Sequence, residues 1–261
     1  MDYQTTAIVL CAGLGSRIGL PEGQNKCAAA VRETSPVQYG VSSLLEAGVD
    51  QVIVVTGYAS DSVRMALSDY EGDKRIRLIH NPCYSKHGCN YSLACGMEAV
   101  AAEKAGRVII AEGDSLLHRE SIHQLVSQKA DAASLVREKA YVDRKRSVIA
   151  VGRKGKILRY EYDPSHTGQV SICKEGEDIL GESMQLWSFS GRPLEVLKKL
   201  MMDYKSRADK GNEPMLHSGI YSINQIEMEI EPVLSRRPED WINLNTQDDL
   251  RKAGMAEWIG K

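Results

Sequence analysis

Hydrophobic runs alternate with helical patterns along the first half of the chain. Short runs rich in valine and isoleucine, bounded by polar or turn-forming residues, are typical of buried strands. Between them, apolar residues recur with the spacing of one helix face. This alternation predicts βαβ units, with a mainly parallel sheet that helices cover on both faces. The predicted strands are 7–11, 51–55, 76–80 and 107–111, and the predicted helices are 36–47, 60–69 and 91–104.

The pattern changes after residue 140. Polar turns, instead of long helices, separate short strand-like pieces at 148–151, 156–162 and 182–189. These pieces predict that the second half extends the sheet in a mixed or antiparallel manner. Further helices are expected at 119–127, 194–205 and 246–258.

Composition excludes several classes of function. With 261 residues and a formal net charge of −2, the chain has no basic face for nucleic acid and no polybasic segment for a membrane. No apolar run approaches the roughly 20 residues that a membrane span needs, and no leader precedes the first predicted strand. The expected location is therefore cytoplasmic. The six cysteines form no Cys-x-x-Cys pair, so we expect free thiols and no zinc site.

The loop after the first predicted strand carries the most informative chemistry. Gly13 and Gly15 leave backbone N–H groups open to a close ligand, and successive N–H groups form a concavity that suits phosphate oxygens. Ser16, Arg17 and Lys26 add a hydroxyl group and two cations to the same region. Arginine binds phosphate with a planar fork, and lysine binds it as a point charge. The loop therefore predicts a nucleoside triphosphate as ligand.

Two other glycine-loop motifs fit the sequence less well. A P-loop requires Gly-x-x-x-x-Gly-Lys-Ser/Thr, and the chain contains no such string. The dinucleotide fingerprint requires Gly-x-Gly-x-x-Gly, but the last interval in Gly13, Gly15 and Gly19 is one residue too long. That fingerprint also requires an acid after the second strand, where this chain has no carboxylate. A dehydrogenase is therefore disfavoured.

Four segments resemble the nucleotidyltransferases that join an NTP to a phosphorylated small molecule. The string from Ala7 to Arg17, followed by Lys26, is similar to the signature loop of that family. Its relatives usually have Pro-Lys-x-Leu at the lysine, whereas here Asn25 precedes the lysine and Cys27 follows it. The other similar segments are 45–58, 112–114 and 242–250.

The resemblance implies a fold and a set of nucleotide contacts. The fold is a three-layer α/β/α sandwich with a mainly parallel, mixed central sheet, of the nucleotide-diphospho-sugar transferase type. One domain would cover residues 1–261, with a nucleotide-binding half at 1–135 and an acceptor-binding half at 136–261. Ser16 could instead cap the following turn, and Arg17 and Lys26 could be exposed loop charges. The implied nucleotide contacts are Leu10, Ala12, Gly13, Gly15, Ser16, Arg17, Lys26 and Glu112.

The segment from Asn81 to Leu93 resembles a stretch of the choline-phosphate and phosphonate cytidylyltransferases. In those proteins this stretch lines the pyrimidine pocket. Asn90 and Ser92 could offer amide and hydroxyl groups to the edge of a base, or one of them could cap the helix that follows. The resemblance therefore favours CTP over the other nucleotides.

A nucleotidyltransferase requires a divalent cation to neutralise the triphosphate, and Mg²⁺ binds carboxylate and phosphate oxygens together. Asp114 is the first predicted metal ligand, although it could also cap the helix expected at 119–127. By resemblance the second ligand is Asn245, with Asn243 and Asp248 as alternatives. Many relatives have an aspartate at this point, and Asn245 could equally be the cap of the last helix.

Acceptor recognition has two sets of candidates. A quaternary amine would require an aromatic cage, whereas a phosphonate would require cations and hydrogen-bond donors. Ordinary core packing is the alternative for each aromatic residue. The aromatic candidates are Tyr160, Tyr162, Trp187 and Tyr221, and the polar candidates are Arg137, Arg159, Lys174 and His217.

The sequence thus predicts a Mg²⁺-dependent cytidylyltransferase, with Lys26, Arg17 and Asp114 as the catalytic residues. It would transfer CMP from CTP to a small phosphonate or phosphorylated acceptor, such as a phosphocholine-like molecule, and release pyrophosphate. One alternative is a sugar-1-phosphate nucleotidyltransferase that uses another NTP. Another is a nucleotide-binding protein that has lost catalysis. A homodimer is possible, and neither nucleic acid nor a membrane is an expected partner.

Overall fold

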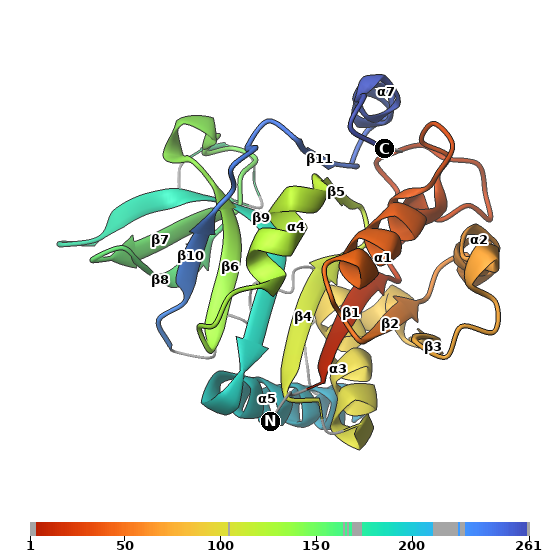
Figure 1. Ribbon diagram of the computed structural model, residues 1–261, viewed down its shortest axis with the longest axis horizontal. Helices are drawn as coiled ribbons and strands as arrows, with labels where there is room; N and C mark the ends of the chain where they lie inside the picture. Colours follow the sequence, from red (N-terminus) through yellow and green to blue (C-terminus); the bar gives the residue numbers. More distant parts are fainter. Residues whose placement is uncertain are drawn as a thin grey trace.

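A mixed β-sheet forms the centre of the fold. The computed structural model describes residues 4–103, 105–163, 165, 167–168, 174–210, 224 and 228–259. Within these residues the sheet has nine strands, and seven of them follow the order β10-β6-β9-β4-β1-β2-β3 (Figure 1). The seven strands are β1 (Thr5–Cys11), β2 (Gln51–Thr56), β3 (Ile76–His80), β4 (Arg107–Glu112), β6 (Ala132–Arg137), β9 (Asp178–Ser190) and β10 (Glu231–Leu234).

Strand direction brings the ends of several strands to one edge of this sheet. β1 runs parallel to β2 and β4, and β2 runs parallel to β3. The long strand β9 runs antiparallel to both β4 and β6. The carboxyl ends of β1, β4 and β6 therefore lie at the same edge as the amino end of β9. In open α/β sheets, ligands bind beyond the carboxyl ends of the parallel strands.

Two smaller strand pairs complete the β-structure of the described residues. The hairpin of β7 (Ile149–Arg153) and β8 (Lys156–Glu161) joins the main sheet through β7, which pairs with β9. A separate ladder pairs β5 (Ser115–Leu117) with β11 (Trp241–Asn243) in antiparallel fashion. This ladder brings the C-terminal part of the chain next to the end of β4 (Figure 1).

Helices cover both faces of the sheet, because successive strand residues point to opposite sides. Ile8 and Leu10 pack under α3 and α5, whereas Ala7 and Val9 pack under α1, α2 and α4. The helices are α1 (Pro36–Glu46), α2 (Ser60–Ala66), α3 (Tyr84–Glu103), α4 (Arg119–Val126), α5 (Gly191–Asp209) and α7 (Gln247–Met255). The predicted three-layer sandwich is therefore confirmed.

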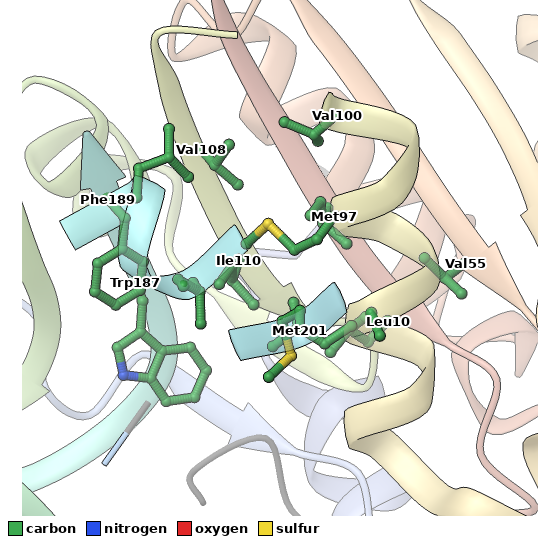
Figure 2. Close-up of a cluster of buried hydrophobic side chains, with 14 of the residues drawn as sticks. Leu10, Val55, Met97, Val100, Val108, Ile110, Trp187, Phe189 and Met201 are labelled. Atoms are coloured by element: carbon green, nitrogen blue, oxygen red, sulfur yellow. The ribbon is translucent and has the colours of Figure 1, made fainter. Parts of the chain in front are cut away.

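The cluster under α3 and α5 contains the largest buried side chains. Figure 2 shows Met97 of α3 and Met201 of α5 beside Ile110 of β4 and Trp187 and Phe189 of β9. Trp187 and Phe189 are at most 1% exposed. Fully burying a large side chain of this kind stabilises a protein by about 2–3 kcal/mol, so this face holds β4, β9 and the two helices together.

The predicted strands and most of the predicted helices are confirmed to within a few residues. One helix differs, because α3 begins at Tyr84 and contains a kink at Gly88, where φ is +61°. Asn90 and Ser92 therefore have helical backbone inside α3, so the prediction that one of them caps a helix is wrong. The pattern of apolar residues did not predict β5, β6, β10 or β11.

The five described cysteines are free thiols, as the sequence predicts. Cys173 lies outside the described residues. Among the helices that the structure describes, none is both long enough and apolar enough to cross a membrane.

Candidate active site

The glycine loop follows β1 and lies at the edge of the sheet formed by the carboxyl ends of its parallel strands. Gly15 has φ +61°, and a Cβ atom there would lie 3.3 Å from the Cδ and Cγ atoms of Lys26. The loop therefore packs directly on the stem of this lysine. Gly13, Ser16 and Arg17 are exposed, so they are accessible to a ligand. Leu10 and Ala12, which the sequence also predicts to contact the nucleotide, lie at the end of β1 and the start of the loop and are at most 6% exposed.

Asn25 fixes the position of Lys26, and sequence reasoning did not assign it any role. It is completely buried, and its Nδ2 donates hydrogen bonds to the carbonyl oxygens of Cys11 (2.9 Å) and Tyr58 (2.8 Å). Its Oδ1 accepts a hydrogen bond from the backbone N–H of Cys27 at 2.9 Å. One amide group thus joins the ends of β1 and β2 to the 3₁₀ turn that begins at Lys26. The only signal in the sequence was an asparagine where relatives usually have proline.

Asp114 lies in the turn between β4 and β5, and its carboxylate forms an ion pair with the ammonium group of Lys26. The two side chains are only 11% and 18% exposed, respectively. Burial, the largest single effect, lowers the pKa of Lys26, but the charge of Asp114, the hydrogen bond to Asp114 and other neighbouring groups together raise that pKa to about 12. The two sequence-predicted residues, which lie far apart in the chain, are therefore brought together as a charged pair.

Asp114 has no role as a helix cap. The N-cap of α4 is His118, whose ring Nδ1 accepts a hydrogen bond from the backbone N–H of Glu120 at 3.2 Å. The backbone carbonyl of Asp114 accepts a hydrogen bond from the N–H of Leu244 at 2.9 Å. This contact leaves the carboxylate facing Lys26 and connects the turn to the segment after β11.

The segment after β11 brings two asparagines near this turn. Oδ1 of Asn245 accepts a hydrogen bond from Nη2 of Arg17 at 2.9 Å, which joins the glycine loop to the C-terminal part of the chain. Thr246, not Asn245, caps α7, through a capping box with Asp249. Asp248 is exposed and forms ion pairs with Arg251 and Lys252 within α7. These contacts favour Asn245 over Asp248 as the residue that faces the site.

Asn243 is held by Gln185, a residue of β9 with the left-handed φ of +61°. Its Nδ2 donates a hydrogen bond to Oε1 of Gln185 at 3.0 Å. Its own Oδ1 is buried and has no hydrogen-bond partner among the described residues. A buried carbonyl oxygen without a partner is costly unless a ligand or water satisfies it.

The oxygen donors at this edge fit a magnesium ion. Mg²⁺ needs one or two carboxylate or carbonyl ligands from the protein when a substrate phosphate and water complete its octahedron. Asp114 supplies a carboxylate, Asn245 supplies an amide oxygen, and Asn243 has an unsatisfied one. Among the described side chains, no group of three or more His, Cys, Asp or Glu residues could hold a metal ion.

Glu112 ends β4, two residues before Asp114, and Sγ of Cys89 donates a hydrogen bond to its Oε1 at 3.4 Å. Burial of the carboxyl group, together with the nearby charge of Asp114, raises the pKa of Glu112 to about 7. Its carboxyl group is therefore partly protonated at neutral pH, unlike that of an ordinary glutamate.

This raised pKa predicts that folding stability depends on pH. Between pH 4.5, the ordinary pKa of glutamate, and pH 7, the folded protein binds a proton that the unfolded chain releases. Glu112 should therefore lower the free energy of unfolding by up to about 3 kcal/mol as the pH rises through this range. Urea unfolding at pH 5 and pH 8, without metal ions, measures the loss. Glu112→Gln should reduce this loss, whereas Glu195→Gln, which changes an exposed side chain of α5, should leave it unchanged. An identical loss in Glu112→Gln would contradict this assignment.

The segment after β3 is held together by its own polar groups. Nδ2 of Asn81 donates a hydrogen bond to Oγ of Ser92 at 2.9 Å, and Oδ1 of Asn81 accepts one from the N–H of Cys83 at 2.8 Å. Asn90 and Ser92 are at most 3% exposed. These contacts join Ser92 to the start of the segment after β3, and the contact of Asn90 and Ser92 with a base stays a prediction.

Most aromatic candidates for the acceptor site belong to the core. Trp187 and Tyr160 are at most 2% exposed, and their rings pack edge to face at 6.1 Å. Tyr162 packs against the same core. Trp187 and Tyr160 therefore cannot form a cage for a quaternary amine, because no ligand could reach their rings, whereas Tyr162 is only partly buried. Tyr221, like His217, lies outside the described residues.

The polar acceptor candidates differ in their surroundings. Arg159 is bound by the carboxylates of Glu161 and Glu177, and Lys174 is exposed. Arg137 lies at the carboxyl end of β6, where its Nε donates a hydrogen bond to Glu182 at 2.6 Å. Its guanidinium carbon lies 5.2 Å from the ring centre of Tyr141 and 4.8 Å from that of Trp241. Sequence reasoning named Arg137 but missed Glu182 and both rings, which lie far apart in the chain.

A sequence profile for one family, described as "Domain of unknown function (DUF6564)", matches residues 37–257. The chain belongs to the DUF6564 family. The matched region contains Asp114, Arg137 and Asn245 but begins after the glycine loop and Lys26.

Several curated relatives of this DUF6564 chain are cytidylyltransferases. A CTP:phosphoglutamine cytidylyltransferase of Campylobacter jejuni is 26% identical over 133 residues, and a choline-phosphate cytidylyltransferase of Streptococcus pneumoniae is 31% identical over 97 residues. These matches cover 50% and 36% of the DUF6564 chain, which spans 51% and 40% of the two relatives. A 2-aminoethylphosphonate cytidylyltransferase of Lancefieldella rimae is 25% identical over 235 residues, covering 88% of this chain and 85% of the relative.

Solved structures show the same fold. A CTP:phosphocholine cytidylyltransferase from Streptococcus pneumoniae is superimposed with a TM-score of 0.67 and 16% identity, over 97% of the DUF6564 chain and 98% of that protein. An inositol-1-phosphate CTP transferase from T. maritima gives a TM-score of 0.68 at 14% identity, over 95% and 92% of the two chains. The fold of the DUF6564 chain and its resemblance to nucleotidyltransferases, with cytidylyltransferases among its relatives, are thus confirmed.

Proposed function

We propose that the chain is a Mg²⁺-dependent cytidylyltransferase that transfers CMP from CTP to a small phosphorylated or phosphonate acceptor. The observation that carries this proposal is the meeting of the glycine loop, Lys26 and Asp114 at one edge of the sheet. The cytidylyltransferase relatives support CTP as the donor. The residues up to about 135 would bind the nucleotide, and the residues from 136 would bind the acceptor.

In this reaction an oxygen of the acceptor phosphate or phosphonate attacks the α-phosphorus of CTP in line with the leaving group. A new phosphorus–oxygen bond forms, the bond from the α-phosphorus to the bridging oxygen breaks, and pyrophosphate leaves with both electrons of that bond. Most of the rate enhancement of such a transfer comes from positioning and charge neutralisation. Bound Mg²⁺ would neutralise triphosphate charge, held by Asp114 and Asn245 with Asn243 nearby.

The protein's own cations have defined tasks in this scheme. Lys26 forms an ion pair with Asp114, so in this scheme its ammonium group would already lie near the triphosphate that binds there. On binding, it would exchange the carboxylate for a phosphate oxygen. Arg17, which bonds to Asn245, would offer its planar fork to the triphosphate. The loop N–H groups of Gly13 and Gly15 would bind the remaining phosphate oxygens.

The test is pyrophosphate release by the purified protein with Mg²⁺ and each of CTP, UTP, GTP and ATP. Each nucleotide is combined with phosphocholine, 2-aminoethylphosphonate, hydroxyalkylphosphonates and sugar 1-phosphates. Turnover with CTP and a phosphonate or non-sugar phosphate would support the proposal. Turnover only with another NTP and a sugar 1-phosphate would replace it with the sugar-nucleotide alternative. Tight CTP binding without any turnover would support a nucleotide-binding protein instead.

A further inference from the structure

The carboxyl end of β6 lies at the same edge of the sheet as Asp114. Arg137, the last residue of β6, pairs across the ladder with Glu182 of β9, and β9 also pairs with β4. Two strand spacings separate β6 from β4, which corresponds to about 10 Å. A small acceptor whose phosphate reacts near Asp114 could therefore reach Arg137 with its other end.

A direct side-chain contact also connects the two places. Nε1 of Trp241 donates a hydrogen bond to Oγ of Ser115 at 2.6 Å, and Ser115 directly follows Asp114. The ring of the same tryptophan lies 4.8 Å from the guanidinium carbon of Arg137. The indole of Trp241 thus contacts both Ser115, which follows the predicted metal ligand Asp114, and Arg137.

Arg137 is held in place by three neighbours. Its Nε and Nη2 atoms contact one carboxylate oxygen of Glu182, at 2.6 and 2.5 Å, and Glu182 is only 8% exposed. Its guanidinium carbon lies close to the rings of Tyr141 and Trp241, whose negative faces attract a cation. Its Nη1 donates to none of the residues that the structure describes. One edge of a clamped guanidinium group, 22% exposed as a side chain, therefore remains available to a ligand.

We propose that Arg137 selects acceptors with an anionic tail and rejects acceptors with a quaternary ammonium tail. This inference rests on the cytidylyltransferase function proposed above and narrows its substrate class. The rings of Tyr141 and Trp241, which could contact a trimethylammonium group at this end of β6, already hold the protein's own cation. A carboxylate tail would instead accept hydrogen bonds from the free guanidinium edge, the geometry that arginine provides best.

The experiment compares three acceptors that differ in the charge of their tails. Binding of 3-phosphonopropionate, 2-aminoethylphosphonate and phosphocholine is measured by calorimetry, with Mg²⁺ and a CTP analogue whose α,β-bridge is a methylene group. The wild-type protein should bind 3-phosphonopropionate about tenfold more tightly than phosphocholine, because a hydrogen-bonded charge pair contributes about 1.5 kcal/mol or more. Arg137→Ala should remove this preference and improve phosphocholine binding several-fold, since the aromatic faces become free.

Two further variants separate this role from a structural one. Arg137→Lys retains the positive charge but loses the planar fork, so it should weaken carboxylate binding and still reject phosphocholine. Arg192→Ala, which removes an exposed arginine of α5 at the opposite edge, should leave all three affinities unchanged. If Arg137→Ala fails to fold by circular dichroism, the lysine variant carries the test.

Several outcomes would overturn the proposal. These are a wild type that prefers phosphocholine, Arg137 variants that alter no acceptor affinity, and CTP-analogue binding without binding of any of the three acceptors. Failure to bind the CTP analogue at all would instead overturn the proposed cytidylyltransferase function. The two failures are therefore distinguishable in the same titrations.

Discussion

Asp114→Asn should lower the rate of pyrophosphate release from CTP by about a thousandfold, equivalent to roughly 4 kcal/mol of transition-state stabilisation. The substitution keeps the size of the side chain but removes the charge that would hold a cation beside the triphosphate. It also leaves the ammonium group of Lys26 without its ion-pair partner. Steady-state rates with CTP, Mg²⁺ and the acceptor found in the panel above measure the effect.

A structural loss would look different from a loss of catalysis. The thermal unfolding midpoint and the affinity for the CTP analogue should be recorded for the same variant. Asp203→Asn, an exposed position of α5 at the opposite edge of the sheet, is the matched control and should retain the wild-type rate. If Asp114→Asn retains near-normal turnover while folded, Asp114 is not a metal ligand.

Gly113→Ala should destabilise the fold by about 3 kcal/mol, at the upper end of the cost of overpacking a core. A Cβ atom at this position would lie 2.3 Å from Sγ of Cys11 and 2.8 Å from the carbonyl oxygen of Leu10. The backbone oxygen cannot move without disturbing the parallel pairing of β1 and β4. Urea unfolding measures the change, and loss of nucleotide binding should accompany it because Asp114 is the next residue.

Gly40→Ala provides the comparison for this glycine. Gly40 lies inside α1, and an added Cβ would meet nothing within 4 Å. Alanine is a better helix former, so this variant should be more stable than the wild type by about 1 kcal/mol. Equal stability of the Gly113 and Gly40 variants would mean that the turn before Asp114 adjusts without cost.

The first half of the fold could be predicted from sequence because its signals are local. Runs such as Val52 to Val55 are β-branched and continuous, as strands buried on both faces require. β6 was missed because its sequence begins Ala-Ala-Ser, which has little strand character, and β10 and β11 have only four and three residues. Their pairing depends on partners that are distant in the chain.

The candidate site also has one part that short motifs predict and another part that only the assembled fold shows. The glycine loop, Lys26 and Asp114 are visible as short motifs, but the ion pair between the last two depends on how the strands assemble. The role of Asn25 could not be predicted, because its amide contacts carbonyl groups of two other segments. The rings around Arg137 come from positions about a hundred residues apart, and no local pattern connects them.

The pairing of β9 with both β4 and β6 limits how this chain can be divided. The strand β9 is thirteen residues long and pairs with β4 on one side and with β6 on the other. A fragment that stopped near residue 135 would leave the apolar edge of β4 with unpaired backbone groups, which favours aggregation. Truncations of this protein, and insertions into it, should therefore be placed in surface loops and not near residue 135.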